Sequence, residues 1–121
     1  MERLYFATAL SLILHQIDAA FWQEWKMFAV PGGIQGFLAF NGIAVGALLC
    51  GYRSVLLRGR HARAWALGCG GVGVTTFILH AGFALSGRKD FSLPLSVLAI
   101  LACLAFGTAL VVTALRPRPV Q

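Results

Sequence analysis

The sequence predicts an all-α integral membrane protein, a bundle of four transmembrane helices with both termini in the cytoplasm. Of the 121 residues, 59% are hydrophobic and only 12% are charged, whereas soluble domains usually carry about 25% charged residues. Four apolar runs of about 18 to 22 residues follow one another, and each can cross about 30 Å of hydrocarbon. We expect residues 1–121 to form a single membrane domain, with spans at about 4–22, 34–52, 64–85 and 94–115.

The first span, residues 4–22, ends near Trp22 and Trp25, and indole side chains favour the headgroup level of a membrane. A cleaved signal peptide is the alternative interpretation, because small residues follow the apolar run. We favour a retained span, since the N-terminus is nearly neutral and since His15 and Asp18 are unusual near a cleavage site.

A Pro-Gly-Gly sequence at residues 31–33 is a strong break in the chain, and the second span, residues 34–52, follows it. Gly42 and Gly46 in this span form a pattern of small residues four apart. This pattern permits the close approach of another helix.

The third span, residues 64–85, contains a GxGxxG match at residues 68–73. No strand precedes the match, so it indicates helix packing rather than dinucleotide binding. In the fourth span, residues 94–115, the small residues Cys103 and Gly107 lie four apart and predict a packing face.

The basic residues near the span ends predict the orientation, because cytoplasmic loops carry an excess of Lys and Arg. One side has seven of them: Arg3, Arg53, Arg58, Arg60, Arg63, Arg116 and Arg118. The other side has Lys26, Arg88 and Lys89. We therefore place both termini in the cytoplasm and predict a multi-pass protein of a bacterial inner membrane. We expect the lipid bilayer to be its main partner, with the basic side chains near the lipid headgroups. We expect no nucleic-acid partner, since the sequence has no soluble basic domain.

One face of the first span is unusually polar. Its members follow one another by three or four residues: Thr8, Ser11, His15, Asp18, Trp22 and Trp25. An ionised Asp in the middle of a membrane costs about 2.5–3.5 kcal/mol on insertion scales. We therefore expect this face to meet a partner helix or a water-filled cavity rather than lipid.

Depth along the helices predicts which residues complete this polar face. At about 1.5 Å per residue, His15 and Asp18 lie roughly 16 Å and 21 Å along the first span. His80 lies roughly 24 Å along the third span, which runs in the same direction. Asn41, on the antiparallel second span, falls in the same layer. We expect these four residues to lie close together in the outer half of the membrane.

The chemistry of these groups leaves several interpretations open. An imidazole beside a carboxylate can hold a proton near neutral pH, and His15, Asp18 and His80 together could ligate a transition metal ion. A buried hydrogen bond that fixes the helix register is the structural alternative. Trp22 should lie above this site. Glu24 is expected to be a solvated charge, unless a bend in the chain turns it over the site.

We expect a binding protein rather than an enzyme, with a site for a proton, a metal ion or a small ligand. One alternative is a membrane cofactor protein or enzyme, in which His15 and His80 ligate haem or His15 and Asp18 move protons on a lipophilic substrate. Another is a structural or transporter-like subunit of an oligomer, with a second copy or another membrane protein as its partner. The three cysteines lie in apolar runs without a CxxC spacing and predict small hydrophobic side chains.

The segment HQIDAAFWQEWKMFAVPGG resembles a family of uncharacterised small bacterial membrane proteins. The resemblance rests on a His-x-x-Asp-Ala motif from His15, a Trp-x-Glu-Trp motif from Trp22 and a Pro-Gly-Gly turn from Pro31. It implies a four-helix membrane fold and no particular activity.

Overall fold

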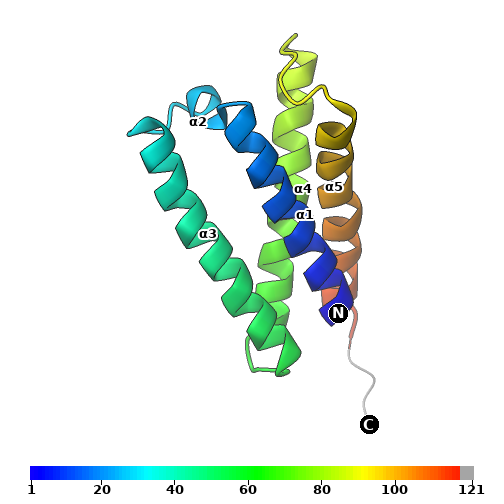
Figure 1. Ribbon diagram of the computed structural model, residues 1–121. Coiled ribbons are helices and arrows are strands. Elements are labelled where there is room, and N and C mark those ends of the chain that lie inside the picture. Colours follow the sequence, from blue (N-terminus) through cyan, green and yellow to red (C-terminus); the bar gives the residue numbers. More distant parts are fainter. Residues whose placement is uncertain (118–121) are drawn as a thin grey trace.

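The computed structural model describes residues 1–117, which form four long helices and one short helix (Figure 1). The elements are α1 (Glu2–Phe21), α2 (Glu24–Met27), α3 (Gly33–Leu56), α4 (Ala62–Leu85) and α5 (Pro94–Leu115). Each long helix is long and apolar enough to cross a membrane. No strand occurs within residues 1–117.

The four long helices coincide with the four apolar runs, so the all-helical prediction is confirmed. The largest difference in bounds is at the end of α3, which continues to Leu56 rather than stopping at residue 52. Hydropathy falls at Arg53 and Ser54, but the helical backbone continues through them. The short helix α2 is absent from the prediction, because a single turn carries no hydrophobic periodicity.

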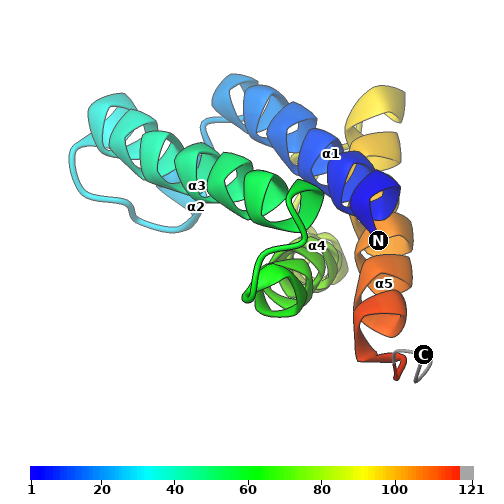
Figure 2. The ribbon, with the colours of Figure 1, turned by 90° about the horizontal axis from the view of Figure 1, so that it is seen from below.

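In Figure 2, α1 and α3 lie on one side of the bundle and α4 and α5 on the other. The most extensive contact joins α4 to α5, and α1 also packs along α5. Figure 1 shows that α3 diverges from α1 and α4 toward the end where α2 lies. This divergence separates the helices next to the candidate site described below.

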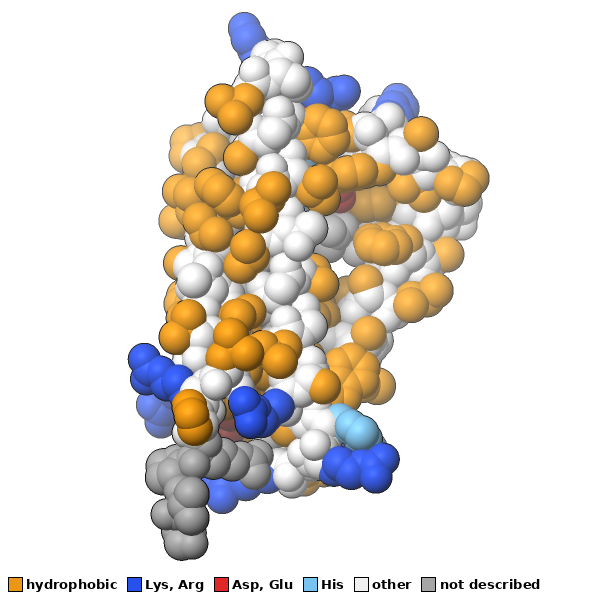
Figure 3. All heavy atoms as spheres, turned by 180° about the vertical axis from the view of Figure 1, so that it is seen from behind, with side chains coloured by type: hydrophobic (Ala, Val, Ile, Leu, Met, Phe, Trp, Pro, Cys, Tyr) orange, Lys and Arg blue, Asp and Glu red, His pale blue; other side chains and the backbone are white. Residues whose placement is uncertain are grey.

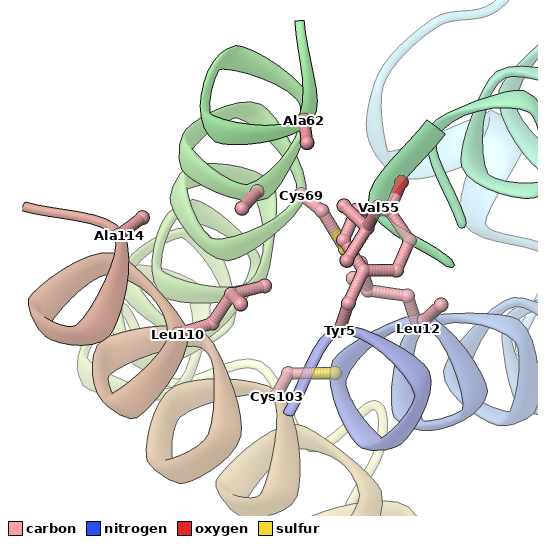
Figure 4. Close-up of a cluster of buried hydrophobic side chains, with 10 residues drawn as sticks. Tyr5, Leu12, Val55, Ala62, Cys69, Cys103, Leu110 and Ala114 are labelled. Carbon is pink, nitrogen blue, oxygen red and sulfur yellow. The ribbon is translucent and has the colours of Figure 1, made fainter. Parts of the chain in front are cut away.

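Buried side chains from all four long helices meet near the end of the bundle where α1 begins and α5 ends (Figure 4). This cluster consists of Tyr5, Ala9, Leu12, Val55, Ala62, Ala66, Cys69, Cys103, Leu110 and Ala114. The Tyr5 hydroxyl donates a hydrogen bond of 3.0 Å to the Leu48 carbonyl, which ties α1 to α3. Cys69 and Cys103 act as small buried hydrophobic residues, as predicted, whereas Cys50 is exposed on α3.

Glycines permit the close approach of α4 and α5. A Cβ atom added at Gly107 would lie 2.8 Å from the Gly70 carbonyl oxygen, and one added at Gly73 would lie 2.7 Å from the Cys103 carbonyl oxygen. The predicted packing role of the glycine-rich segment and of Gly107 is therefore confirmed. The close approach that Gly42 and Gly46 permit is not used within residues 1–117, because no atom lies within 4 Å of a Cβ at either position.

Candidate functional site

The imidazoles of His15 and His80 meet between α1 and α4. Their Nε2 atoms lie 3.1 Å apart, and 1% of His15 and 7% of His80 remain exposed. The two rings are nearly perpendicular, with centroids 4.7 Å apart. The two helices run in the same direction, so residues at similar depth face each other, as the sequence predicts.

Glu24 joins the two histidines because the chain breaks immediately before it. Gln23 has a φ of 54° in the left-handed region and ends the path of α1. A continuous helix would place Glu24 about 180° around from His15, since nine residues turn through about 900°. Instead α2 folds back over the helix ends and leaves only 7% of Glu24 exposed. The expectation of a solvated Glu24 is therefore wrong, and the alternative of a bend that turns it over the site is what the structure shows.

One carboxylate oxygen of Glu24 completes a triangle of ligand atoms. Its Oε1 lies 3.2 Å from Nε2 of His80 and 3.7 Å from Nε2 of His15. We call His15, Glu24 and His80 the His–Glu–His group; all three residues are buried. Two imidazoles and one carboxylate are a known ligand set for zinc, which keeps a fourth position for water or substrate. Ligands at about 2.0–2.1 Å from a tetrahedral ion lie about 3.3 Å apart, and the three observed distances bracket this value.

The surroundings of Glu24 keep its carboxylate ionised. Burial by itself raises the pKa of Glu24, but the contacts with His15 and His80 outweigh it and lower the pKa from 4.5 to about 2. An ionised carboxylate beside two imidazole nitrogens is the state that a cation requires.

Phe91 closes the group on the side of the α4–α5 loop. Its ring centroid lies 4.3 Å from that of His80 and 5.3 Å from that of His15. Trp22 packs on the outside of Phe91, and its indole N–H donates a hydrogen bond of 3.3 Å to Ser96 on α5. Phe91 is a residue that the sequence analysis missed, since a lone aromatic residue in a polar loop gives no signal of its position.

A cavity of about 400 Å³ adjoins the His–Glu–His group. Besides these three residues it is lined mainly by apolar side chains from α2, α3 and α4, and by Gln16 of α1. Viewed from behind, the molecule shows acidic atoms inside a hollow that hydrophobic side chains surround (Figure 3). A bound metal ion would therefore have room for a further ligand on the cavity side.

Comparison with known proteins assigns the chain to a family. A model of the family of unknown function DUF6713 matches residues 1–117. The chain belongs to this family. No curated protein and no solved structure matches it. DUF6713 therefore supports the predicted relationship to an uncharacterised family and adds no activity.

In this DUF6713 member, two residues predicted for the site lie apart from the His–Glu–His group. Asp18 belongs neither to the group nor to the cavity lining. It lies about 60° around α1 from His15, on the side opposite Gln16, which faces the cavity. Asn41 donates a hydrogen bond of 2.9 Å to the Phe37 carbonyl of its own helix. Glu24 thus takes the position that the sequence assigned to Asp18.

Proposed function

We propose that this protein is a multi-pass inner-membrane protein whose His–Glu–His group binds one divalent transition metal ion, with Zn²⁺ as the first candidate. The observation that carries the proposal is the triangle of Nε2, Nε2 and Oε1, with sides of 3.1, 3.2 and 3.7 Å. Imidazole and carboxylate ligands together favour zinc over magnesium or calcium, which prefer oxygen ligands alone. Both termini lie on the cytoplasmic side in this proposal, so the site lies in the outer half of the membrane.

The same geometry disfavours a haem between the two histidines. Axial imidazoles on opposite faces of a haem iron would have nitrogens about 4 Å apart, with the porphyrin plane between them. Here the nitrogens are 3.1 Å apart and Glu24 closes the same triangle. A single ion fits this arrangement better than a planar cofactor.

The proposal is tested by metal analysis of the detergent-purified protein and of four variants. Wild type should hold one Zn²⁺ per chain. His15→Ala, His80→Ala and Glu24→Gln should each weaken binding by more than about 100-fold, because even changes in the second shell of a metal cost about 10- to 100-fold. Asp18→Asn is the matched control and should bind as wild type does, since Asp18 is outside the group.

Thermal unfolding separates metal binding from a purely structural role of the group. A ligand that binds only the folded state stabilises it by about 2.7 kcal/mol at 100 times its Kd. Zn²⁺ should therefore raise the Tm of wild type and of Asp18→Asn, but not that of Glu24→Gln. The alternative outcome is that His15→Ala lowers the Tm, while Zn²⁺ changes the Tm of neither wild type nor any variant. The group is then a hydrogen bond that fixes the helix register, and the proposal is wrong.

A further inference from the structure

The cavity beside the His–Glu–His group has walls of two different kinds. Most of its lining is apolar or aromatic, and the side chains that matter here are Trp25, Phe28, Phe37, Phe40, Val72 and Leu79. Besides the His–Glu–His group, the polar residues of the lining are Gln16 on α1 and Thr75 and Thr76 on α4. The Thr76 hydroxyl already donates a hydrogen bond to the Val72 carbonyl. The cavity volume of about 400 Å³ is within the range of small-molecule binding sites. Such a cavity fits a molecule with an apolar body and one polar end.

Gln16 indicates what that polar end must do. Its Oε1 atom is buried and has no hydrogen-bond partner within residues 1–117. A buried polar group without a hydrogen-bond partner destabilises the fold, so a ligand that pairs with the amide would remove this penalty. The carbonyl and NH₂ ends of an amide have the same shape, and Gln16 can therefore either accept a hydrogen bond from the ligand or donate one to it.

The cavity reaches the apolar flank of the bundle. Phe40 on α3 and Val72 and Leu79 on α4 line the cavity and are also among the exposed hydrophobic residues. These residues border the cavity on α3 and α4, two helices that diverge toward the end where α2 lies (Figure 1). In a membrane this flank would face hydrocarbon chains, so a ligand would enter from the bilayer itself.

Charge balance selects the polar end of that ligand. A divalent ion held by two neutral imidazoles and one carboxylate keeps one unit of positive charge in a buried site, which is costly without an anion beside it. We propose that the cavity binds a long-chain monocarboxylate, with its chain along the apolar wall and its carboxylate on the metal ion. The second carboxylate oxygen then accepts a hydrogen bond from the Gln16 amide. This inference rests on the metal site proposed above.

Cobalt spectroscopy tests the contact between the carboxylate and the metal. Co²⁺ takes the same ligands as Zn²⁺ and absorbs visible light according to its coordination. Laurate should shift the visible bands of the Co²⁺-loaded wild type, whereas methyl laurate, which has the same chain without the carboxylate, should leave them unchanged. Glu24→Gln should show no such bands with either compound.

Tryptophan quenching tests whether the chain enters the cavity. Trp25 lines the cavity, and Trp65 lies near the start of α4, outside the lining. In a Trp22→Phe/Trp65→Phe background, stearate brominated in mid-chain should quench Trp25 saturably. In the matched Trp22→Phe/Trp25→Phe background, Trp65 should show only the weak linear quenching of a fatty acid dissolved in the detergent micelle.

A pair of variants on α4 locates the entrance. Val72→Phe places a larger side chain at the opening and should weaken stearate binding by about tenfold or more. Ile78→Phe makes a comparable change at an exposed position of the same helix outside the cavity lining and should leave binding unchanged.

The outcomes separate the two proposals. Absence of Co²⁺ bands in ligand-free wild type overturns the metal site. If those bands appear but laurate and methyl laurate act alike, or if Trp65 is quenched as strongly as Trp25, the long-chain carboxylate is overturned and the metal site stands. A shift with laurate alone, together with saturable quenching of Trp25, supports both.

Discussion

Burial and the two imidazoles act on the pKa of Glu24 in opposite directions. Burial raises this pKa, and the contacts with His15 and His80 lower it. The contacts have the larger effect, so the pKa falls to about 2. A carboxylate with a lowered folded pKa stabilises the folded state above its unfolded pKa, near 4.5, and loses this contribution as the pH falls through the folded pKa.

The metal-free protein should therefore become less stable as the pH drops from about 4.5 to about 2. A pKa difference of this size corresponds to about 3 kcal/mol of folding free energy at neutral pH. The measurement is the free energy of unfolding in detergent against pH, for wild type and for Glu24→Gln. The variant lacks the titrating group, so its curve should be flatter over this range; parallel curves would contradict the role assigned to Glu24.

Gln23 positions Glu24 through its backbone rather than through its side chain. A left-handed conformation costs a non-glycine residue about 1–2 kcal/mol, and glycine avoids this cost. Gln23→Gly should therefore keep Zn²⁺ binding and raise stability by about 1 kcal/mol. Gln23→Val, which is β-branched and disfavours a positive φ, should lower both. The measurements are denaturant unfolding and Zn²⁺ competition, and equal effects of the two substitutions would show that the turn does not hold Glu24.

The close contact of α4 with α5 depends on backbone approach at glycine. A methyl group at Gly107 would lie 2.8 Å from the Gly70 carbonyl oxygen, which cannot move without moving α4. Gly107→Ala should destabilise the protein by about 1–3 kcal/mol, as overpacked cores do. Gly71→Ala is the control, because no atom lies within 4 Å of a Cβ there and because Ala favours a helix over Gly by about 1 kcal/mol. The measurement is thermal unfolding followed by circular dichroism. The Tm should fall in Gly107→Ala and should not fall in Gly71→Ala.

The helices were predictable from the sequence because apolar runs of sufficient length leave few alternatives to a helix in an apolar setting. The meeting of His15 and His80 followed from the same reasoning, since depth along two parallel helices is set by residue number. The choice between Asp18 and Glu24 was not predictable. It depends on one left-handed residue, Gln23, whose side chain carries no preference for that conformation.

Helix contacts were predictable only in part. Every small residue in an apolar run permits a close approach, but the fold uses Gly70, Gly73 and Gly107 and leaves Gly42 and Gly46 without a neighbour. The hydrophobic pattern does not distinguish these cases, because a helix that is apolar all round has no face assigned to its neighbours. Which glycine meets a backbone is decided by the rotation of each helix in the whole bundle.

The molecule as a whole has charged ends and an apolar middle. Basic side chains lie at both ends in Figure 3, with hydrophobic side chains covering the surface between them. In Figure 1 the N-terminus, the end of α5 and the α3–α4 loop lie at one end, and α2 lies at the other. Six of the seven arginines assigned to the terminal end are within the described residues; Arg118 lies outside them. The His–Glu–His group is at the opposite end, beside α2.

This charge distribution predicts which side of the membrane the proposed metal site faces. With both termini in the cytoplasm, a C-terminal green fluorescent protein fusion should fluoresce and a C-terminal alkaline phosphatase fusion should be inactive. Replacing Arg53, Arg58 and Arg60 with Gln brings the two sides near balance, so part of the population should insert in the inverted orientation. The same change at Lys26, Arg88 and Lys89 should leave the orientation as it is. An active phosphatase fusion on the wild-type chain would place α2 and the metal group on the cytoplasmic side, where the ion would come from the cell interior instead of from outside.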